Sequence, residues 1–279
     1  MDKRKLRVLL RHKSAMVGLG VVALFALMAA VIGLLSPHDP SAWQPGQQNQ
    51  GASGSHFCGT DNSGRDIFTR LFFAARTSLL IGVLCVAFSM AVGLPLGAAA
   101  GYFGGWTDMA ISRFIDVLLS FPSILLAICI AAPMGASLKT VIIAVGVIGV
   151  PQFARQVRAS VLALREQDFV QASRALGAGH ARILFVDILP NALGPIIVLA
   201  TLGVGTSILT AAGLSFLGIG VEAGTAEWGA MLHDGYHGWR QSASLAVWSG
   251  LAISMAVLGF NLFGDGLRDA LDPRVEKKA

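Results

Sequence analysis

Charged residues are scarce in this chain of 279 residues, because Asp, Glu, Lys and Arg together make up only 13% of it. A soluble domain carries about 25%. Hydrophobic residues account for 54% of the sequence, and the mean hydropathy is +0.66. This composition excludes an ordinary soluble domain and predicts an all-α integral membrane protein.

Two further absences narrow the function. The three cysteines, Cys58, Cys85 and Cys129, form no C-x-x-C pair and no evenly spaced framework, so neither a disulfide scaffold nor a cysteine metal site is predicted. A nucleotide-binding loop G-x-x-x-x-G-K-[ST] is also missing, since the nearest segment, GASLKT at 135–140, has Leu138 where glycine is required. We therefore expect no ATPase activity and no cofactor bound by this chain itself.

The sequence contains several long runs without a charged residue. A helix needs roughly 20 apolar residues to cross a bilayer, and stretches without Lys, Arg, Asp or Glu occur at 14–38, 77–107, 117–138, 140–154, 188–221 and 241–264. The fourth run is short, but Lys139 and Arg155 flank it and can extend to the two interfaces. The sequence thus predicts about six transmembrane helices, the first of them an uncleaved span rather than a signal peptide.

Basic residues predict the orientation of these spans. With six crossings and a cytosolic N-terminus, only Arg65, Arg70, Arg76, Lys139 and Arg240 of the 21 basic residues fall outside, which leaves 16 on the inner side. This asymmetry follows the positive-inside rule and predicts a multi-pass protein of the bacterial cytoplasmic membrane with both termini cytosolic. Because no basic face is interleaved with aromatic residues, nucleic acid is not an expected partner.

The outer segments are expected to be short of regular structure. In 39–76 the first half is rich in Gly, Pro, Ser and Gln, whereas Ile67, Leu71 and Ala74 have helical spacing and predict a short interfacial helix before the second span. In the other outer segment, 214–240, Trp228 and Trp239 are predicted at the membrane boundary. The chain then divides into an N-terminal transmembrane helix with its outer loop (1–76), a core transmembrane domain (77–270) and a cytosolic tail (271–279).

The largest inner segment, 155–193, carries a pattern that lipid cannot explain. Helix-favouring residues run from 157 to 176, and Gly177 and Gly179 then permit a sharp turn or cap. A second apolar-faced segment follows, which Pro190 and Pro195 are expected to separate from the fifth span. Such a helix–turn–helix predicts either a docking element for a partner protein or an amphipathic segment on the lipid headgroups.

This stretch resembles the inner-loop motif of binding-protein-dependent ABC importer permeases, E-A-A, three residues, Gly, nine residues, Ile-x-Leu-Pro. The matching residues are Ala172, Gly177, Leu189 and Pro190, while Gln171, Ser173 and Asp187 replace the Glu, the second Ala and the Ile. The segments GTDNSGRDIFTRL (59–71), LSFLGIGV (214–221), EWGAML (227–232) and GDGLRDALDPR (264–274) are similar to those of the second permease subunit in the dipeptide, oligopeptide and nickel branch.

The resemblance implies a type I ABC importer transmembrane domain that forms half of a translocation path. It also implies its partners, which are a second permease subunit, two cytosolic ATPase subunits that bind ATP and Mg²⁺, and an extracytoplasmic substrate-binding protein. Contact with the ATPase is implied for the inner-loop residues Gln171, Ala172, Ser173, Gly177, Ala178, Asp187, Leu189 and Pro190. For the outer face, we expect a docking or gating role for Asp61, Arg65, Asp66, Glu227 and Trp228.

Two other classes of membrane protein remain as alternatives. An ion-coupled secondary transporter needs ionisable residues in mid-membrane, but the charges lie at span ends, where Arg113 and Asp116 are expected to form a structural i, i+3 pair. A membrane-embedded enzyme needs a convergent catalytic cluster. The only candidates are His233 and His237, one helical turn apart, and without a third ligand they are read as polar loop residues, as are His56 and Cys58.

Substrate choice has the weakest signal in the sequence. Spans rich in glycine and alanine, such as AVGLPLGAAAGYFGG, allow close helix packing and suggest a path with small apolar walls. Such walls discriminate little, so selectivity is expected to lie with the binding protein. Dipeptide, oligopeptide, nickel and metal chelate all stay open, with the TAEWGAMLHDG segment favouring nickel or a metal chelate slightly.

Overall fold

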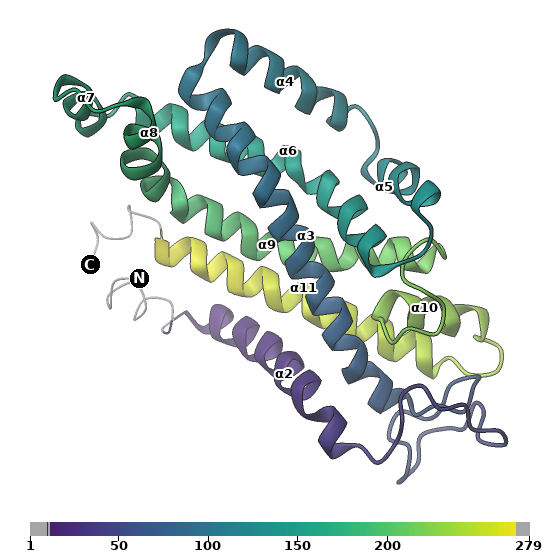
Figure 1. The fold of residues 1–279 in the computed structure, drawn as a ribbon. Helices are drawn as coiled ribbons and strands as arrows, with labels where there is room; N and C mark the ends of the chain where they lie inside the picture. The colour runs from purple at the N-terminus through teal and green to yellow at the C-terminus, as the bar shows by residue number, and fades with distance from the viewer. Residues whose placement is uncertain (1–9, 11, 272–279) are drawn as a thin grey trace.

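The computed structural model describes residues 10 and 12–271, and these form a bundle of helices without a β-strand (Figure 1). The elements follow in the order α2 (Lys13–Leu35), α3 (Ile67–Phe103), α4 (Gly105–Leu119), α5 (Ser123–Ala131), the 3-10 turn η1 (Ala132–Met134), α6 (Leu138–Arg165), α7 (Asp168–Ala175), α8 (His180–Arg182), the π-helix η2 (Ile183–Ile188), α9 (Leu189–Phe216), α10 (Trp228–His237) and α11 (Ser244–Leu271).

Five stretches of the described chain are long and apolar enough to cross a membrane. They are α2, α3, α6, α11 and the continuous helical run His180–Phe216, which comprises α8, η2 and α9. α4 with α5 and η1 would give a sixth crossing, although its two halves are bent by 89°. The predicted all-α fold with about six transmembrane helices is therefore confirmed.

The break between α4 and α5 lies within the predicted third span, 117–138. Pro122 has no N–H to donate to a helix and disfavours the helical conformation at Phe121, so α4 ends at Leu119 and a new helix begins at Ser123. Beyond it, the short fourth run, 140–154, lies in the first part of the 28-residue α6. Hydropathy located these segments, but it carries no information about the bend.

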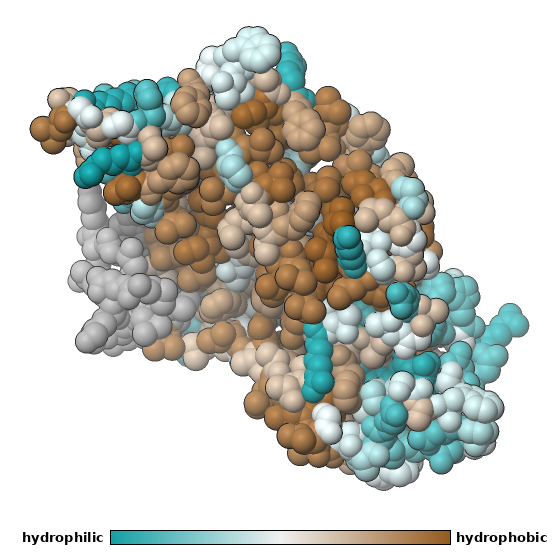
Figure 2. Space-filling view, viewed as in Figure 1, coloured by the Kyte–Doolittle hydropathy of each residue, from teal (hydrophilic) through white to brown (hydrophobic). Residues whose placement is uncertain are grey.

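The bundle has two distinct ends. α7 and α8 lie at one end, here called the α7 end, and the irregular segment 36–66 lies with α10 at the other, here called the loop end (Figure 1). On the face drawn in Figure 2, apolar residues form a broad band and hydrophilic residues gather toward these two ends. The band is the surface that lipid hydrocarbon or another apolar partner would cover.

α3 corrects the prediction of a separate interfacial helix. Its 37 residues begin at Ile67 and continue without a break into the span. The Asp66 side chain caps the start by accepting the Thr69 N–H at 2.8 Å, and no residue between 67 and 77 interrupts the helix. The division placed at residue 76 consequently falls inside α3.

The role predicted for Pro190 is also wrong. The helix does not end there, because η2 runs directly into α9 with Pro190 in the first turn of α9. A π turn lets a helix absorb a local change in its hydrogen-bonding pattern, and prolines are tolerated in membrane helices for related reasons. Pro95, Pro151 and Pro195 likewise lie inside continuous helices.

Three glycines let α3 and α6 approach closely. A Cβ added to Gly93, Gly97 or Gly101 would lie within 3 Å of α6, for example 2.8 Å from Val157 Cβ in the case of Gly97. These glycines are four residues apart and therefore share one face of α3. Any larger side chain on this stripe would push the two helices apart.

Two ion pairs join α4 to α6 near the α7 end. Arg158 donates from Nε and Nη2 to the two carboxylate oxygens of Asp108 at 2.5 and 2.6 Å. Arg155 Nη2 donates to Asp116 Oδ1 at 2.9 Å. Asp116 thus pairs across helices with Arg155 rather than with Arg113, the partner that local spacing suggested.

Candidate functional site

α7 is a short helix held to the bundle by one buried side chain. Val170 is fully buried in a cluster that also contains Val157 and Val161 of α6 and Ile183 and Ile188 of η2. The other α7 residues are exposed, apart from the half-buried Ser173. The helix therefore presents most of its surface outward.

The turn after α7 requires glycine. Gly177 has φ +82°, a left-handed conformation that residues with a Cβ seldom adopt. The Gly177 N–H donates to Arg174 O and the Ala178 N–H to Ser173 O, both at 3.0 Å, which is the Schellman pattern of helix termination. Gly179, by contrast, has φ −72° and needs no glycine for its backbone conformation.

The residues predicted to contact an ATPase lie in two places. Gln171, Ala172 and Ser173 are on α7, and Gly177 and Ala178 are in the turn directly after it. Asp187, Leu189 and Pro190 lie further along, in η2 and the first turn of α9. The exposed part of the motif is thus α7 with its turn, while the Leu–Pro part belongs to the base of the next long helix.

Gln171, which stands where the family motif has Glu, donates a side-chain hydrogen bond to the end of α6. Its Nε2 donates to Arg165 O at 3.4 Å, at the carboxyl end of α6. A glutamate could not donate this bond. The contact is exposed and long, so it makes a small contribution to the position of α7.

Contacts that join the end of α3 to α8 and to the end of α6 were not anticipated from the sequence. Tyr102 Oη lies 2.9 Å from His180 Nδ1, which joins the end of α3 to the start of α8. Arg165 Nη1 donates to Gly101 O and Tyr102 O at 3.3 and 3.2 Å. The partners are 63 to 78 residues apart, so no local pattern could have indicated them.

At the loop end, Asp61 organises the segment 59–70. Its buried carboxylate accepts Arg65 Nε at 2.8 Å and the N–H groups of Ser63 and Arg65 at 2.8 and 2.9 Å. Arg70, fully buried, lies 3.6 Å away. These charge-assisted bonds fix the loop. Whether the loop also meets another protein stays a prediction.

Glu227 and Trp228 are buried at the start of α10. Glu227 caps the helix through the N–H groups of Gly229 and Ala230, and its Oε1 accepts Ser78 Oγ of α3 at 3.3 Å. Trp228 has no exposed surface and donates its Nε1–H to Leu71 O at 2.9 Å. Its ring packs in the core against Phe25 rather than on the outer surface, and its depth relative to the membrane boundary stays a prediction.

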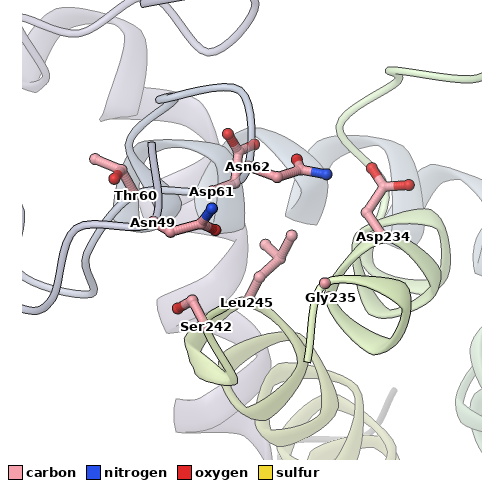
Figure 3. A pocket seen from close by; sticks show the side chains of 9 residues that line it. Asn49, Thr60, Asp61, Asn62, Asp234, Gly235, Ser242 and Leu245 are labelled. Carbon is pink, nitrogen blue, oxygen red and sulfur yellow. The ribbon is translucent and has the colours of Figure 1, made fainter. Parts of the chain in front are cut away.

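A small polar pocket separates the loop from α10 and the beginning of α11. Figure 3 shows Asn49, Thr60, Asp61 and Asn62 on the loop side, facing Asp234 and Gly235 of α10 and Leu245 of α11. Two carboxylates and two amides from separate segments thus line one opening.

The histidine pair on α10 does not assemble a three-residue metal site. The His233 and His237 rings lie 4.5 Å apart between centroids, and His233 Nδ1 is 2.7 Å from Phe216 O. Within the described residues, no third His, Cys, Asp or Glu joins them.

Cys58 lies in the outer loop. Its burial, together with the nearby charge of Asp66, raises the pKa of the thiol to about 11, so this thiol stays protonated at neutral pH.

Two family models and several known proteins match this chain. Residues 93–277 match the family model for the binding-protein-dependent transport system inner membrane component, and residues 3–52 match the N-terminal TM domain of oligopeptide transport permease C. The dipeptide transport system permease protein DppC of Alkalihalophilus pseudofirmus is 48% identical over 270 residues, which cover 95% of this chain and 88% of that protein.

Other relatives transport a different compound. The glutathione transport system permease protein GsiD of Pectobacterium atrosepticum is 42% identical over 271 residues, covering 97% of this chain and 90% of its own. A chain from a solved structure of the inward-facing MetNI methionine ABC transporter has a TM-score of 0.60 at 22% identity, covering 74% of this chain and 98% of that chain. At this identity the match shows a shared fold alone.

Proposed function

Because the chain belongs to the family of binding-protein-dependent transport system inner membrane components, in its dipeptide and oligopeptide branch, we propose that it forms one half of the translocation path of a bacterial peptide importer. It is a multi-pass ABC importer permease subunit with the type I transmembrane fold, and not an enzyme in its own right. The other half of the path is proposed to be a second, different permease subunit.

The proposed contact with a cytosolic ATPase subunit is α7 and its turn. Phe169 is 43% exposed and Leu176 is 88% exposed, so apolar surface lies beside the polar residues of a helix whose one fully buried side chain is Val170. Exposed apolar side chains in such an arrangement favour a protein partner. ATP and Mg²⁺ would be bound by that partner, and movement of α7 would couple hydrolysis to opening of the path.

The proposed substrate is a small peptide. The relatives at 42% to 48% identity carry the names of dipeptide and glutathione permeases, both of which denote short peptide compounds. Nickel and metal chelates, which the sequence favoured slightly, find no support among these relatives. Specificity is proposed to reside mainly in a substrate-binding protein outside the membrane.

The proposed orientation places the α7 end in the cytosol and the loop end outside the bacterial cytoplasmic membrane. The loop end would receive the binding protein. Asp61, Arg65, Asp66, Glu227 and Trp228 are proposed to act there by holding the outer surface in shape, since four of them are buried and Arg65 keeps only 11% of its side chain exposed. A gating role would require the loop to shift against α10.

An uptake assay in a strain that lacks this chain tests the proposal. Wild-type chain should restore uptake of a radiolabelled dipeptide or of glutathione, and unlabelled Ni²⁺ should not compete. Gly177→Asp should abolish uptake and weaken co-purification of the ATPase while leaving the amount in the membrane unchanged, because bulk and charge at a desolvated contact cost about 2–5 kcal/mol.

Gln171→Glu is the matched variant and should keep uptake near the wild-type level, because only one weak, exposed hydrogen bond is lost. Restored uptake of Ni²⁺ without any peptide uptake would reject the peptide assignment. Full uptake with full ATPase retention in Gly177→Asp would reject α7 as the coupling element.

A further inference from the structure

Two histidines and an aspartate meet where the outer loop joins the first two long helices. One ring nitrogen each of His38 and His56 and one carboxylate oxygen of Asp66 lie within 4.8 Å of one another. His56 Nδ1 is 2.9 Å from Asp66 Oδ1, and the two imidazole rings lie 4.8 Å apart between centroids. His56 and Asp66 are buried, and His38 is half-buried.

The surroundings of these three groups are those of an oriented ligand set. Asp66 Oδ2 accepts the Thr69 N–H at 2.8 Å, which fixes the carboxylate at the start of α3. His38 Nε2 lies 3.2 Å from Ser55 O, close enough to donate its proton and leave the Nδ1 lone pair free. Hydrogen bonds of this kind hold metal-ligating side chains in position.

The composition of the cluster selects a class of ion. Two imidazoles with one carboxylate suit a divalent transition metal, above all Zn²⁺, and suit Ca²⁺ or Mg²⁺ poorly because those ions take oxygen ligands. Three protein ligands with a fourth position open to water is a common Zn²⁺ arrangement. Cys58 is not among the residues whose ligand atoms meet here.

We propose that His38, His56 and Asp66 bind one Zn²⁺ ion that fastens the outer loop to the ends of α2 and α3. The three residues come from the segment after α2, from the middle of the loop and from the cap of α3. Between α2 and α3 lie more than 30 residues without a helix or a paired strand, stabilised mainly by turns and isolated hydrogen bonds. A metal bound at these three points would restrict that segment far more than the His56–Asp66 bond alone. This site is independent of the transported compound.

Metal titration of the full-length chain tests the site. The chain is purified in detergent with a tag free of histidine, stripped with EDTA, dialysed and titrated with Co²⁺, whose visible absorption reports coordination geometry. We expect one Co²⁺ per chain with the intense bands of a four-coordinate site, displaced by Zn²⁺. Saturating Zn²⁺ should also raise the melting temperature and slow proteolysis within residues 39–66.

Variants separate this site from adventitious binding. His38→Gln and His56→Gln should each weaken Co²⁺ affinity at least about tenfold and remove the Zn²⁺-dependent rise in melting temperature. His237→Gln, which changes the other histidine pair, should do neither. His38 is half-buried, so His38→Gln decides the matter even if His56→Gln fails to fold. Less than one Co²⁺ per chain, or equal affinity in His38→Gln and His237→Gln, would overturn the proposal.

Discussion

The turn at Gly177 allows backbone strain to be separated from side-chain bulk. An alanine Cβ at this position would meet no atom of the chain within 4 Å, so the only cost within the chain is the left-handed backbone conformation at φ +82°. That cost is about 1–2 kcal/mol for a residue with a Cβ. Because Val170 is the only fully buried residue of α7, the strain should be relieved by opening the turn rather than by unfolding the bundle.

Gly179 supplies the matched control two residues away. A Cβ added there would also meet open space, but the φ of −72° at Gly179 is ordinary for any residue. Gly179→Ala should therefore leave the turn unchanged or stabilise it slightly. Gly177→Asn is the third variant, because asparagine tolerates the left-handed region better than alanine.

The assay is co-purification of the ATPase subunits together with peptide uptake, both normalised to the amount of permease in the membrane. A free-energy change of 1–2 kcal/mol lowers the ratio of closed to open turn by roughly 5- to 30-fold, so Gly177→Ala should show a loss of up to that size. Gly177→Asn should fall between Gly177→Ala and wild type. Equal losses for Asn and Ala would mean that the partner excludes any side chain, whereas equal behaviour of Gly177→Ala and Gly179→Ala would refute the strain argument.

Three further predictions concern topology, the core and the loop end. In a background without the native cysteines, Gly179→Cys should react with an impermeant thiol reagent only in inverted vesicles, and labelling of intact cells would reverse the orientation. Trp228→Phe should lower the stability of the purified chain by about 2–4 kcal/mol, measured as a fall in melting temperature, because it loses the bond to Leu71 and leaves a cavity; the exposed Trp239→Phe should have little effect. Arg65→Ala should reduce ATPase stimulation by the binding protein in a salt-dependent way, and unchanged stimulation at every salt concentration would remove the docking role.

Local pattern is enough to predict the spans and the exposed turn. Uncharged length locates the crossings, and the helical segment followed by Gly177 predicts the helix end that the Schellman hydrogen bonds form. The prediction fails where membrane helices follow different rules from soluble ones, since Pro190 is expected to end a helix that continues through a π turn.

Contacts between distant segments could not be predicted from one sequence. The residue types of Glu227 and Trp228 indicate the outer surface, yet Ser78 and Leu71, about 150 residues earlier, hold them in the core. Asp61 and Arg65, by contrast, are only four residues apart and pair within the local range that sequence reasoning can reach. The contact of His38 with His56 could not be predicted either, because nothing in the sequence around His38 indicates that His56 lies beside it.

The glycine stripe between α3 and α6 has a mechanical consequence. Because the stripe packs α3 directly against residues 150–161 of α6, we expect the two helices to move together, and only Glu166 and Gln167 separate α6 from α7. A rod of 28 residues is about 42 Å long, so a tilt of roughly 5° imposed at α7 displaces the opposite end by about 4 Å. If α7 faces the cytosol as proposed, a small rotation of an ATPase partner would then be amplified into a displacement comparable to the diameter of a peptide backbone on the other side of the membrane.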